Sequence, residues 1–263
     1  MKRFGKFILK YFTAFLGSLW LFTFGLFFGR NRDLLTTLAL RFGYGRKKGQ
    51  KTPPILPEIE LKNLVPEALP IRLLEMDYAR GNVSLEELAV INQLVKVRAP
   101  QKIFEMGTFD GRTTLNLAAN CPEGSLVYSL DLPKSQVDST GLQLEEGEKE
   151  LIEKETSGDR YLGRREAEKI IQLYGDTASF DFSPYYNAVD FVFIDASHAH
   201  SYVLNDSLIA LRLLRNGKGT VLWHDYAEWN GVTSALNKLY KTNPNFRGVC
   251  RIRGTYLVAL ILE

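Results

Sequence analysis

The chain has 263 residues, enough for one domain of ordinary size with a sizeable core and an additional segment. Its formal net charge of +3 at pH 7 is too small to indicate a nucleic-acid partner, and none is expected. The two cysteines, Cys121 and Cys250, form neither a disulfide framework nor a metal-binding spacing, which favours small core residues in a reducing compartment.

The first feature along the chain is an apolar segment near the N-terminus. Residues 11–29 carry no charge and are rich in Phe and Leu. As a helix they would extend about 28 Å, close to the ~30 Å hydrocarbon core of a bilayer. A cleaved signal peptide and a helix lying in the membrane interface are the alternatives, but the segment has neither a small-residue cleavage site after it nor a broad polar face. We therefore expect residues 1–32 to form a membrane anchor that contacts the lipid bilayer through residues 11–29.

Basic residues are denser after this segment than before it, up to Lys51. The positive-inside bias then predicts a membrane-anchored protein with its large domain in the cytoplasm. Five of the ten prolines lie between residues 52 and 70. Residues 33–70 are accordingly predicted to be a basic and Pro-rich linker, and residues 71–263 to be the folded domain.

Strand-like and helix-like segments alternate through most of the large domain. Ser84-Leu-Glu-Glu is a capping box that opens a helix through Leu94. From Pro100 onward, short apolar runs are each followed by helix-like segments, which predicts an α/β fold with a mostly parallel sheet covered by helices on both faces. A polar insertion between Leu132 and Arg165 holds six glutamates. It is either a solvated helix or a flap over a bound substrate, and we favour the flap.

The segment Lys102–Thr114 predicts a strand, a glycine-containing turn and the start of a helix. Gly107 and Gly111 would let a ligand approach the backbone closely. Dinucleotide sites use Gly-x-Gly-x-x-Gly, whereas the pattern here is Glu-x-Gly-x-x-x-Gly, beginning at Glu105. A carboxylate at this strand end would repel a diphosphate but suits a cation such as S-adenosylmethionine (SAM). The alternative is a purely structural turn.

Four more acidic residues follow strand-like runs: Asp131, Asp176, Asp195 and Asp225. Asp131 comes about twenty residues after the glycines, where an α/β nucleotide site places the carboxylate that binds the ribose hydroxyls. Each acid alone could cap a helix or a turn. Together they indicate a ligand site at the carboxyl ends of the strands.

Five short segments carry a family resemblance: Phe104–Thr114, Ser129–Pro133, Gly175–Phe182, Phe193–His198 and Trp223–Tyr226. Through them the chain resembles class I SAM-dependent methyltransferases. The closest branch contains the metal-dependent macrolide-sugar O-methyltransferases and the cephalosporin-hydroxylase-like proteins. The resemblance implies a Rossmann-like, doubly wound, mostly parallel seven-stranded sheet with helices on both faces, preceded here by the N-terminal apolar helix. The residues that it implies for SAM binding are Glu105, Gly107, Thr108, Phe109, Gly111, Asp131, Asp176, Thr177 and Asp195.

The three histidines of the chain, His198, His200 and His224, all lie near the ends of the last predicted parallel strands. The resemblance implies a metal site made by Asp195, His224 and Asp225, with His198 as the general base. Mg²⁺ prefers oxygen ligands, so a histidine at 224 leaves three alternatives. His224 lies outside the coordination shell, or the ion is one that accepts imidazole, such as Mn²⁺ or Fe²⁺, or no metal binds.

The expected function is therefore O-methylation of a hydroxyl on a sugar, glycolipid or other small metabolite, with SAM as donor and Mg²⁺ or Mn²⁺ as the candidate ion. The acceptor is expected to be a small molecule or a glycan, and a homo-oligomer is left open. The alternative is a non-catalytic SAM-binding scaffold. The presence of the acidic residues, the glycines and His198 favours the enzyme.

Overall fold

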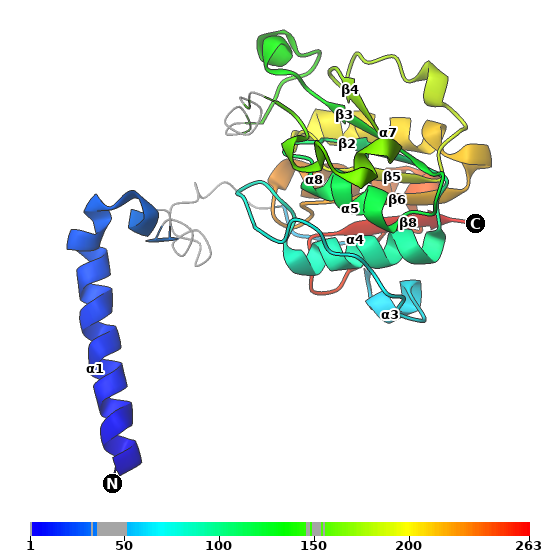
Figure 1. Ribbon diagram of the computed structural model, residues 1–263. Coiled ribbons are helices and arrows are strands. Elements are labelled where there is room, and N and C mark those ends of the chain that lie inside the picture. Colours follow the sequence, from blue (N-terminus) through cyan, green and yellow to red (C-terminus); the bar gives the residue numbers. More distant parts are fainter. Residues whose placement is uncertain (1, 33, 36–51, 146–147, 149–153, 155) are drawn as a thin grey trace. The chain divides into compact units, whose positions relative to one another are not determined.

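The computed structural model describes residues 2–32, 34–35, 52–145, 148, 154 and 156–263. The chain divides into two compact units, Met1–Lys51 and Thr52–Glu263. In the first unit, helix α1 (Lys2–Phe22) is followed by the short 3-10 helix η1 (Phe24–Phe27) (Figure 1). Most of the described apolar side chains of this unit are exposed.

The prediction of a membrane-spanning helix at residues 11–29 is wrong. Among the residues that the structure describes, no helix is both long enough and apolar enough to cross a bilayer. The four basic residues before Tyr11 lie inside α1, and the helix ends at Phe22. Its uncharged part, from Tyr11 to Phe22, is only about 18 Å long at 1.5 Å per residue. The membrane-anchored location and the bilayer contact that were predicted from this span are corrected with it.

The second unit is built on one eight-stranded sheet with the order β1-β7-β8-β6-β5-β2-β3-β4 (Figure 1). All pairings are parallel except those of β8 with β6 and β7. This confirms the mostly parallel α/β fold, with one strand more than expected. The strands are β1 (Glu58–Ile59), β2 (Lys102–Met106), β3 (Leu126–Asp131), β4 (Ile170–Tyr174), β5 (Phe191–Ile194), β6 (Gly219–Trp223), β7 (Cys250–Ile252) and β8 (Val258–Leu262).

Helices cover both faces of the sheet, as predicted. Side chains alternate between the faces, so Ile103 of β2 lies in the apolar layer of α4 and α5, and Phe104 lies in that of α7 and α8. Strands buried on both faces are continuously apolar, which explains the sequence of β5. The α-helices among the described residues of this unit are α3 (Leu61–Leu64), α4 (Leu85–Arg98), α5 (Arg112–Asn120), α7 (His200–Leu213) and α8 (Asn230–Thr242). The 3-10 helices of this unit are η2 (Lys134–Ser139), η3 (Asp159–Tyr161), η4 (Arg165–Lys169), η5 (Ser183–Tyr185), η6 (Arg215–Gly217) and η7 (Pro244–Phe246).

The additional strand comes from the segment that was expected to be a linker. Strand β1 pairs in parallel with β7, and Leu56, Leu64 and Val65 are buried in the apolar layers of the sheet. Residues 52–70 therefore belong to the second unit in this structure, whereas the rest of the predicted linker lies mostly outside the described residues.

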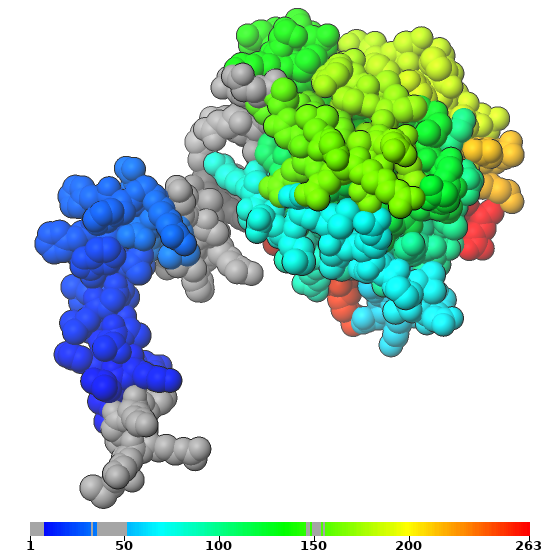
Figure 2. Space-filling view, viewed as in Figure 1, coloured from blue at the N-terminus to red at the C-terminus, as the bar shows by residue number. Residues whose placement is uncertain are grey.

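An extended segment before α4 is held by two side-chain amides of helix α5. The side-chain amide of Asn120 accepts a hydrogen bond from the backbone N–H of Arg72 and donates one to its carbonyl. The side-chain amide of Asn116 does the same with Leu74, and the four donor–acceptor distances lie between 2.8 and 3.0 Å. In Figure 2 this part of the chain, coloured cyan, lies on the surface of the unit. It leads directly into residues 78–84, which reach the cavity described below.

Candidate functional site

A cavity of about 390 Å³ lies at the carboxyl ends of the parallel strands. It is lined by residues at the ends of β2, β3, β4, β5 and β6, by residues of the segment 78–84, and by Leu144, Glu148 and Lys154 of the insertion. The strand order reverses between β2 and β5, and open α/β sheets bind their ligands at such a point. The position of the cavity therefore agrees with the expected ligand site.

Glu105, the acid of the glycine motif, does not line the cavity but is fully buried beside it. The hydroxyls of Thr114 and Ser129 both donate hydrogen bonds to its Oε2. Burial raises the pKa of Glu105 to about 8, so the side chain is largely protonated at neutral pH. Glu105 thus links β2, α5 and β3 within the fold.

The two glycines of the motif are required by the protein's own backbone. Gly107 has φ of +98°, and a Cβ there would lie 2.1 Å from the carbonyl oxygen of Asp195. Gly111 has φ of +83°, and a Cβ would lie 2.6 Å from Cα of Gly158. Of the predicted motif residues, Gly107 and Phe109 line the cavity, whereas Thr108 and Gly111 do not.

Asp131 is the last residue of β3 and lines the cavity. Its Oδ2 is held by residues of the insertion that follows β3. The Nζ of Lys154 lies 2.7 Å from this oxygen, and the hydroxyl of Ser157 donates a hydrogen bond to it. Lys154 also lies over the ring of Phe109, 5.7 Å from its centroid. The insertion therefore reaches the cavity, which supports its interpretation as a flap.

Asp176 also lines the cavity, next to Thr177, but both of its oxygens have partners in the protein. Oδ1 accepts hydrogen bonds from the hydroxyl of Tyr202 at 2.8 Å and from the amide of Ala178 at 3.0 Å. Oδ2 accepts one from the amide of Gly141 at 2.6 Å. Asp176 thereby fixes the start of the insertion to α7.

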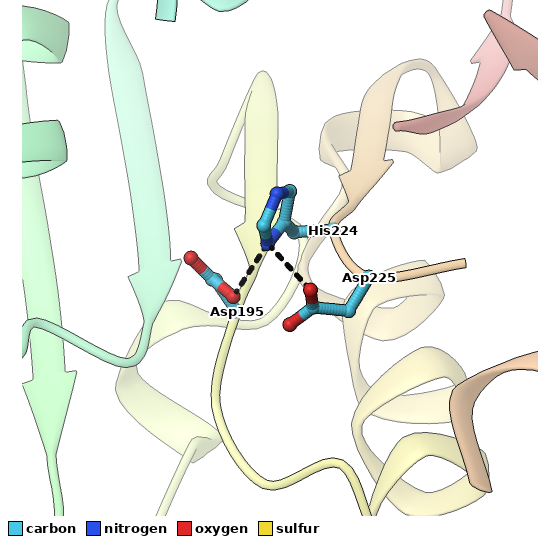
Figure 3. A group of neighbouring side chains, drawn as sticks. All are labelled: Asp195, His224 and Asp225. Atoms are coloured by element: carbon cyan, nitrogen blue, oxygen red, sulfur yellow. Dashed lines mark hydrogen bonds and ion pairs between the residues drawn. The ribbon is translucent and has the colours of Figure 1, made fainter. Parts of the chain in front are cut away.

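Asp195, His224 and Asp225 meet where β5 and β6 end (Figure 3). The Nδ1 of His224 lies 3.3 Å from an Oδ1 of each aspartate, and one ligand atom of each residue lies within 4.8 Å of the others. We call these three residues the Asp-His-Asp cluster. The predicted ligand set is thus brought together at the wall of the cavity. Asp225 has φ of +65°, a backbone conformation that is unfavourable for a residue with a side chain and that recurs at functional sites.

Glu87, which sequence reasoning did not assign to the site, lies on the other side of His224. Its Oε2 is 3.3 Å from Nε2 of His224. Burial raises the pKa of Glu87, but the hydrogen bond and the charge of His224 outweigh it and lower that pKa to about 2. For His224, burial lowers the pKa, but the charges of Asp225 and Asp195 raise it well above its ordinary value. The capping box was the sole sequence signal at Glu87, and it indicated a helix start rather than a site.

His198 lies between two carboxylates. Its Nε2 is 2.7 Å from Oδ2 of Asp225, and its Nδ1 is 2.8 Å from Oε1 of Glu148, a residue of the insertion. The ring is stacked on Trp229 with the centroids 4.2 Å apart. Burial lowers the pKa of His198, but the charge and hydrogen bond of Asp225, together with Glu148, raise it to about 10. The third histidine, His200, bonds Ser234 and does not line the cavity.

Comparisons with known proteins point to one family. Residues 104–226 match the profile of the methyltransferase domain. No curated protein matches the chain. Among solved structures, the SAH-bound methyltransferase PaMTH1 of Podospora anserina is similar, with 12% identity, 89% of this chain and 96% of that chain covered, and a TM-score of 0.50.

Two further structures are similar at lower TM-scores. The O-methyltransferase TomG of Streptomyces achromogenes, in complex with SAM, shares 18% identity over 72% of this chain and 93% of that chain, with a TM-score of 0.47. The O-methyltransferase of Bacillus cereus, in complex with SAH, shares 16% identity over 70% and 84%, with a TM-score of 0.48.

These structural likenesses show the fold alone, and the matched domain assigns the activity. The enzyme interpretation is thereby confirmed over the scaffold, while the narrower macrolide-sugar branch stays a prediction. Residues 104–226 form a methyltransferase domain, which identifies the chain as an enzyme that transfers methyl groups.

Proposed function

We propose that this enzyme transfers the methyl group of SAM to a hydroxyl oxygen of a small-molecule or glycan acceptor, with a divalent cation held by the Asp-His-Asp cluster. The observation that carries the proposal is that the cluster forms one wall of the cavity that Gly107 and Asp131 also line. Donor and cation would then share one space.

The donor is assigned to the part of the cavity near β2 and β3. The carboxylate of Asp131 can accept hydrogen bonds from the ribose hydroxyls. To do so, it would have to give up its present contacts with Lys154 and Ser157. Phe109, Thr177 and Asp195 line the space for the remainder of the donor. Glu105, Thr108 and Gly111 do not line the cavity and would support it by fixing the turn. Asp176 lines the cavity and also fixes the insertion.

The residues of the cluster fit a divalent cation. Ligands at about 2.1 Å from an ion in adjacent octahedral positions lie roughly 3 Å apart. The 3.3 Å separations between Nδ1 of His224 and the two aspartates are compatible with this spacing. Two carboxylates and one imidazole suit Mn²⁺ or Fe²⁺ better than Mg²⁺, which prefers oxygen alone.

A bound cation would neutralise the carboxylates and stabilise the alkoxide that forms on the acceptor. His198 is proposed as the general base. When Asp225 binds the cation instead, Nε2 of His198 loses its carboxylate partner and can accept the hydroxyl proton. Glu148 keeps Nδ1 of the same ring oriented, and the stacked Trp229 holds the plane of the ring. The acceptor would bind beside His198, where Trp229 and residues of the segment 78–84 also line the cavity.

The proposal is tested with purified full-length protein, labelled SAM and a panel of hydroxyl acceptors (sugars, nucleotide sugars and phenols), each assayed with Mn²⁺, with Mg²⁺ and with a chelator. We expect methylated oxygen, and a rate that falls on chelation and recovers more fully with Mn²⁺ than with Mg²⁺. Methyl transfer to nitrogen or carbon, or a rate indifferent to chelation, would contradict the proposal.

A further inference from the structure

We infer that Glu87 is a positioning residue for the cation site: it orients His224 so that Nδ1, rather than Nε2, faces Asp195 and Asp225. The inference rests on the proposed cation site and names a residue outside the predicted ligand set. Glu87 is the third residue of α4, on the opposite side of His224 from the two aspartates.

The carboxylate of Glu87 is itself rigidly held. Its Oε2 accepts hydrogen bonds from the amide of Ser84 at 3.0 Å and from the hydroxyl of Ser84 at 2.8 Å. Its Oε1 accepts one from the amide of Tyr256 at 2.8 Å. The residue is only 5% exposed. A carboxylate fixed by donors from two separate parts of the chain presents His224 with an acceptor in one position.

That acceptor selects the tautomer of His224. A neutral imidazole has one N–H and one lone pair. With Oε2 of Glu87 3.3 Å from Nε2, the ring is favoured with its proton on Nε2 and its lone pair on Nδ1. Nδ1 is the atom that lies 3.3 Å from both aspartates. Without the carboxylate of Glu87, the ring could carry its proton on Nδ1 and donate it to an aspartate, which would remove the imidazole as a ligand.

A helix cap alone does not require this charge. The third position of a capping box takes Gln as well as Glu, because either side chain can accept from the backbone amide of the first residue. Glu87→Gln removes the charge. A neutral oxygen in the place of Oε2 is a weaker acceptor for Nε2 of His224, and an amide nitrogen in that place would donate to Nε2 and favour the other tautomer. In either orientation the amide nitrogen faces one backbone N–H, that of Tyr256 or that of Ser84. Glu86→Gln is the matched control, because it removes an exposed carboxylate from the same first turn of α4 that does not line the cavity.

The test measures Mn²⁺ binding to the metal-free full-length chain by calorimetry without SAM, alongside thermal unfolding. Glu87→Gln is expected to weaken Mn²⁺ binding about 10- to 100-fold, with a Tm that falls but stays well above the temperature of the titration. Glu86→Gln is expected to keep the Tm and the Mn²⁺ affinity of the wild type. Glu87→Asp keeps the charge but shortens the reach to Nε2, and it should weaken Mn²⁺ binding as Glu87→Gln does.

The outcomes separate the two proposals. If the wild type binds Mn²⁺ and both Glu87 variants bind it within about twofold of the wild type, the inference is overturned and the cation site stands. Equal weakening in Glu86→Gln would assign the effect to the loss of negative charge at the start of α4 and also overturn the inference. If the wild type takes up no Mn²⁺, the cation site fails, and the role of Glu87 fails with it.

Discussion

The Nε2 atom of His198 lies 2.7 Å from Oδ2 of Asp225, although the two residues follow different strands, β5 and β6. The same aspartate contacts Nδ1 of His224 through its other oxygen. Asp225 therefore connects the proposed base to the proposed cation site. A change in what Asp225 binds would directly change the hydrogen bonding of His198.

Replacing His198 by Ala should lower kcat for methyl transfer about 10²- to 10⁴-fold, the usual contribution of a general base, while the dissociation constant for SAM changes little. Steady-state kinetics and calorimetry measure the two quantities. His200→Ala is the matched control, because this histidine bonds Ser234 outside the cavity. An unimpaired rate in His198→Ala would refute the assignment of the base.

Replacing Asp131 by Ala should weaken SAM binding by about 1.5–3 kcal/mol, the range for a hydrogen bond to a charged group, or roughly 10- to 100-fold. Calorimetry with SAM measures the loss. Asp159→Ala is the control, because this aspartate is exposed and bonds Thr156 on the same insertion. Unchanged affinity in Asp131→Ala would remove the ribose assignment.

The free energy of unfolding should fall as pH rises between about 4.5 and 8, because of Glu105. Burial raises its pKa from 4.5 to about 8, so over this window the folded state binds the proton and the unfolded state releases it. The contribution is fully present below pH 4.5, and its total loss by pH 8 is on the order of 5 kcal/mol at 1.36 kcal/mol per unit.

Denaturant unfolding at several pH values between 5 and 9 measures this dependence. Glu105→Gln cannot ionise but keeps an oxygen that accepts from Thr114 and Ser129. Its stability curve should therefore be flatter than that of the wild type. Parallel curves for the two proteins would show that Glu105 is not held protonated.

Gly107→Ala should destabilise the fold by about 2–4 kcal/mol, because its Cβ would clash with the carbonyl of Asp195 as well as strain a positive φ. Gly124→Ala separates the two causes. Gly124 also has positive φ, at +77°, but nothing lies within 4 Å of a Cβ there, so about 1 kcal/mol is expected. Denaturant unfolding that gave equal losses would argue against the close approach of β2 and β5.

Much of the site follows from local sequence signals. The acids at the ends of β3, β5 and β6 could be placed at one sheet edge because parallel strands end together, and Asp195, His224 and Asp225 do meet there. The helix that begins after Ser84 could be placed because a capping box is a local pattern, and both of its hydrogen bonds are confirmed.

Other features depend on distant contacts and carry no local signal. The role of Glu105 at the strand end was not predictable, because its burial depends on Thr114 and Ser129, which lie on other elements. Glu87 reaches His224 across 137 positions of sequence, so nothing near either residue indicates the pair. The prediction of a membrane-spanning helix failed for a local reason: the uncharged residues 11–29 were treated as one helix, whereas the helix ends at Phe22.

Anomalous diffraction at the manganese edge, from crystals of the full-length protein grown with SAM and Mn²⁺, tests the account most directly. We predict one manganese peak bounded by Asp195, His224 and Asp225, with the donor in the same cavity and its ribose at Asp131. A donor bound there with no manganese at the three residues, or manganese bound elsewhere, would contradict it.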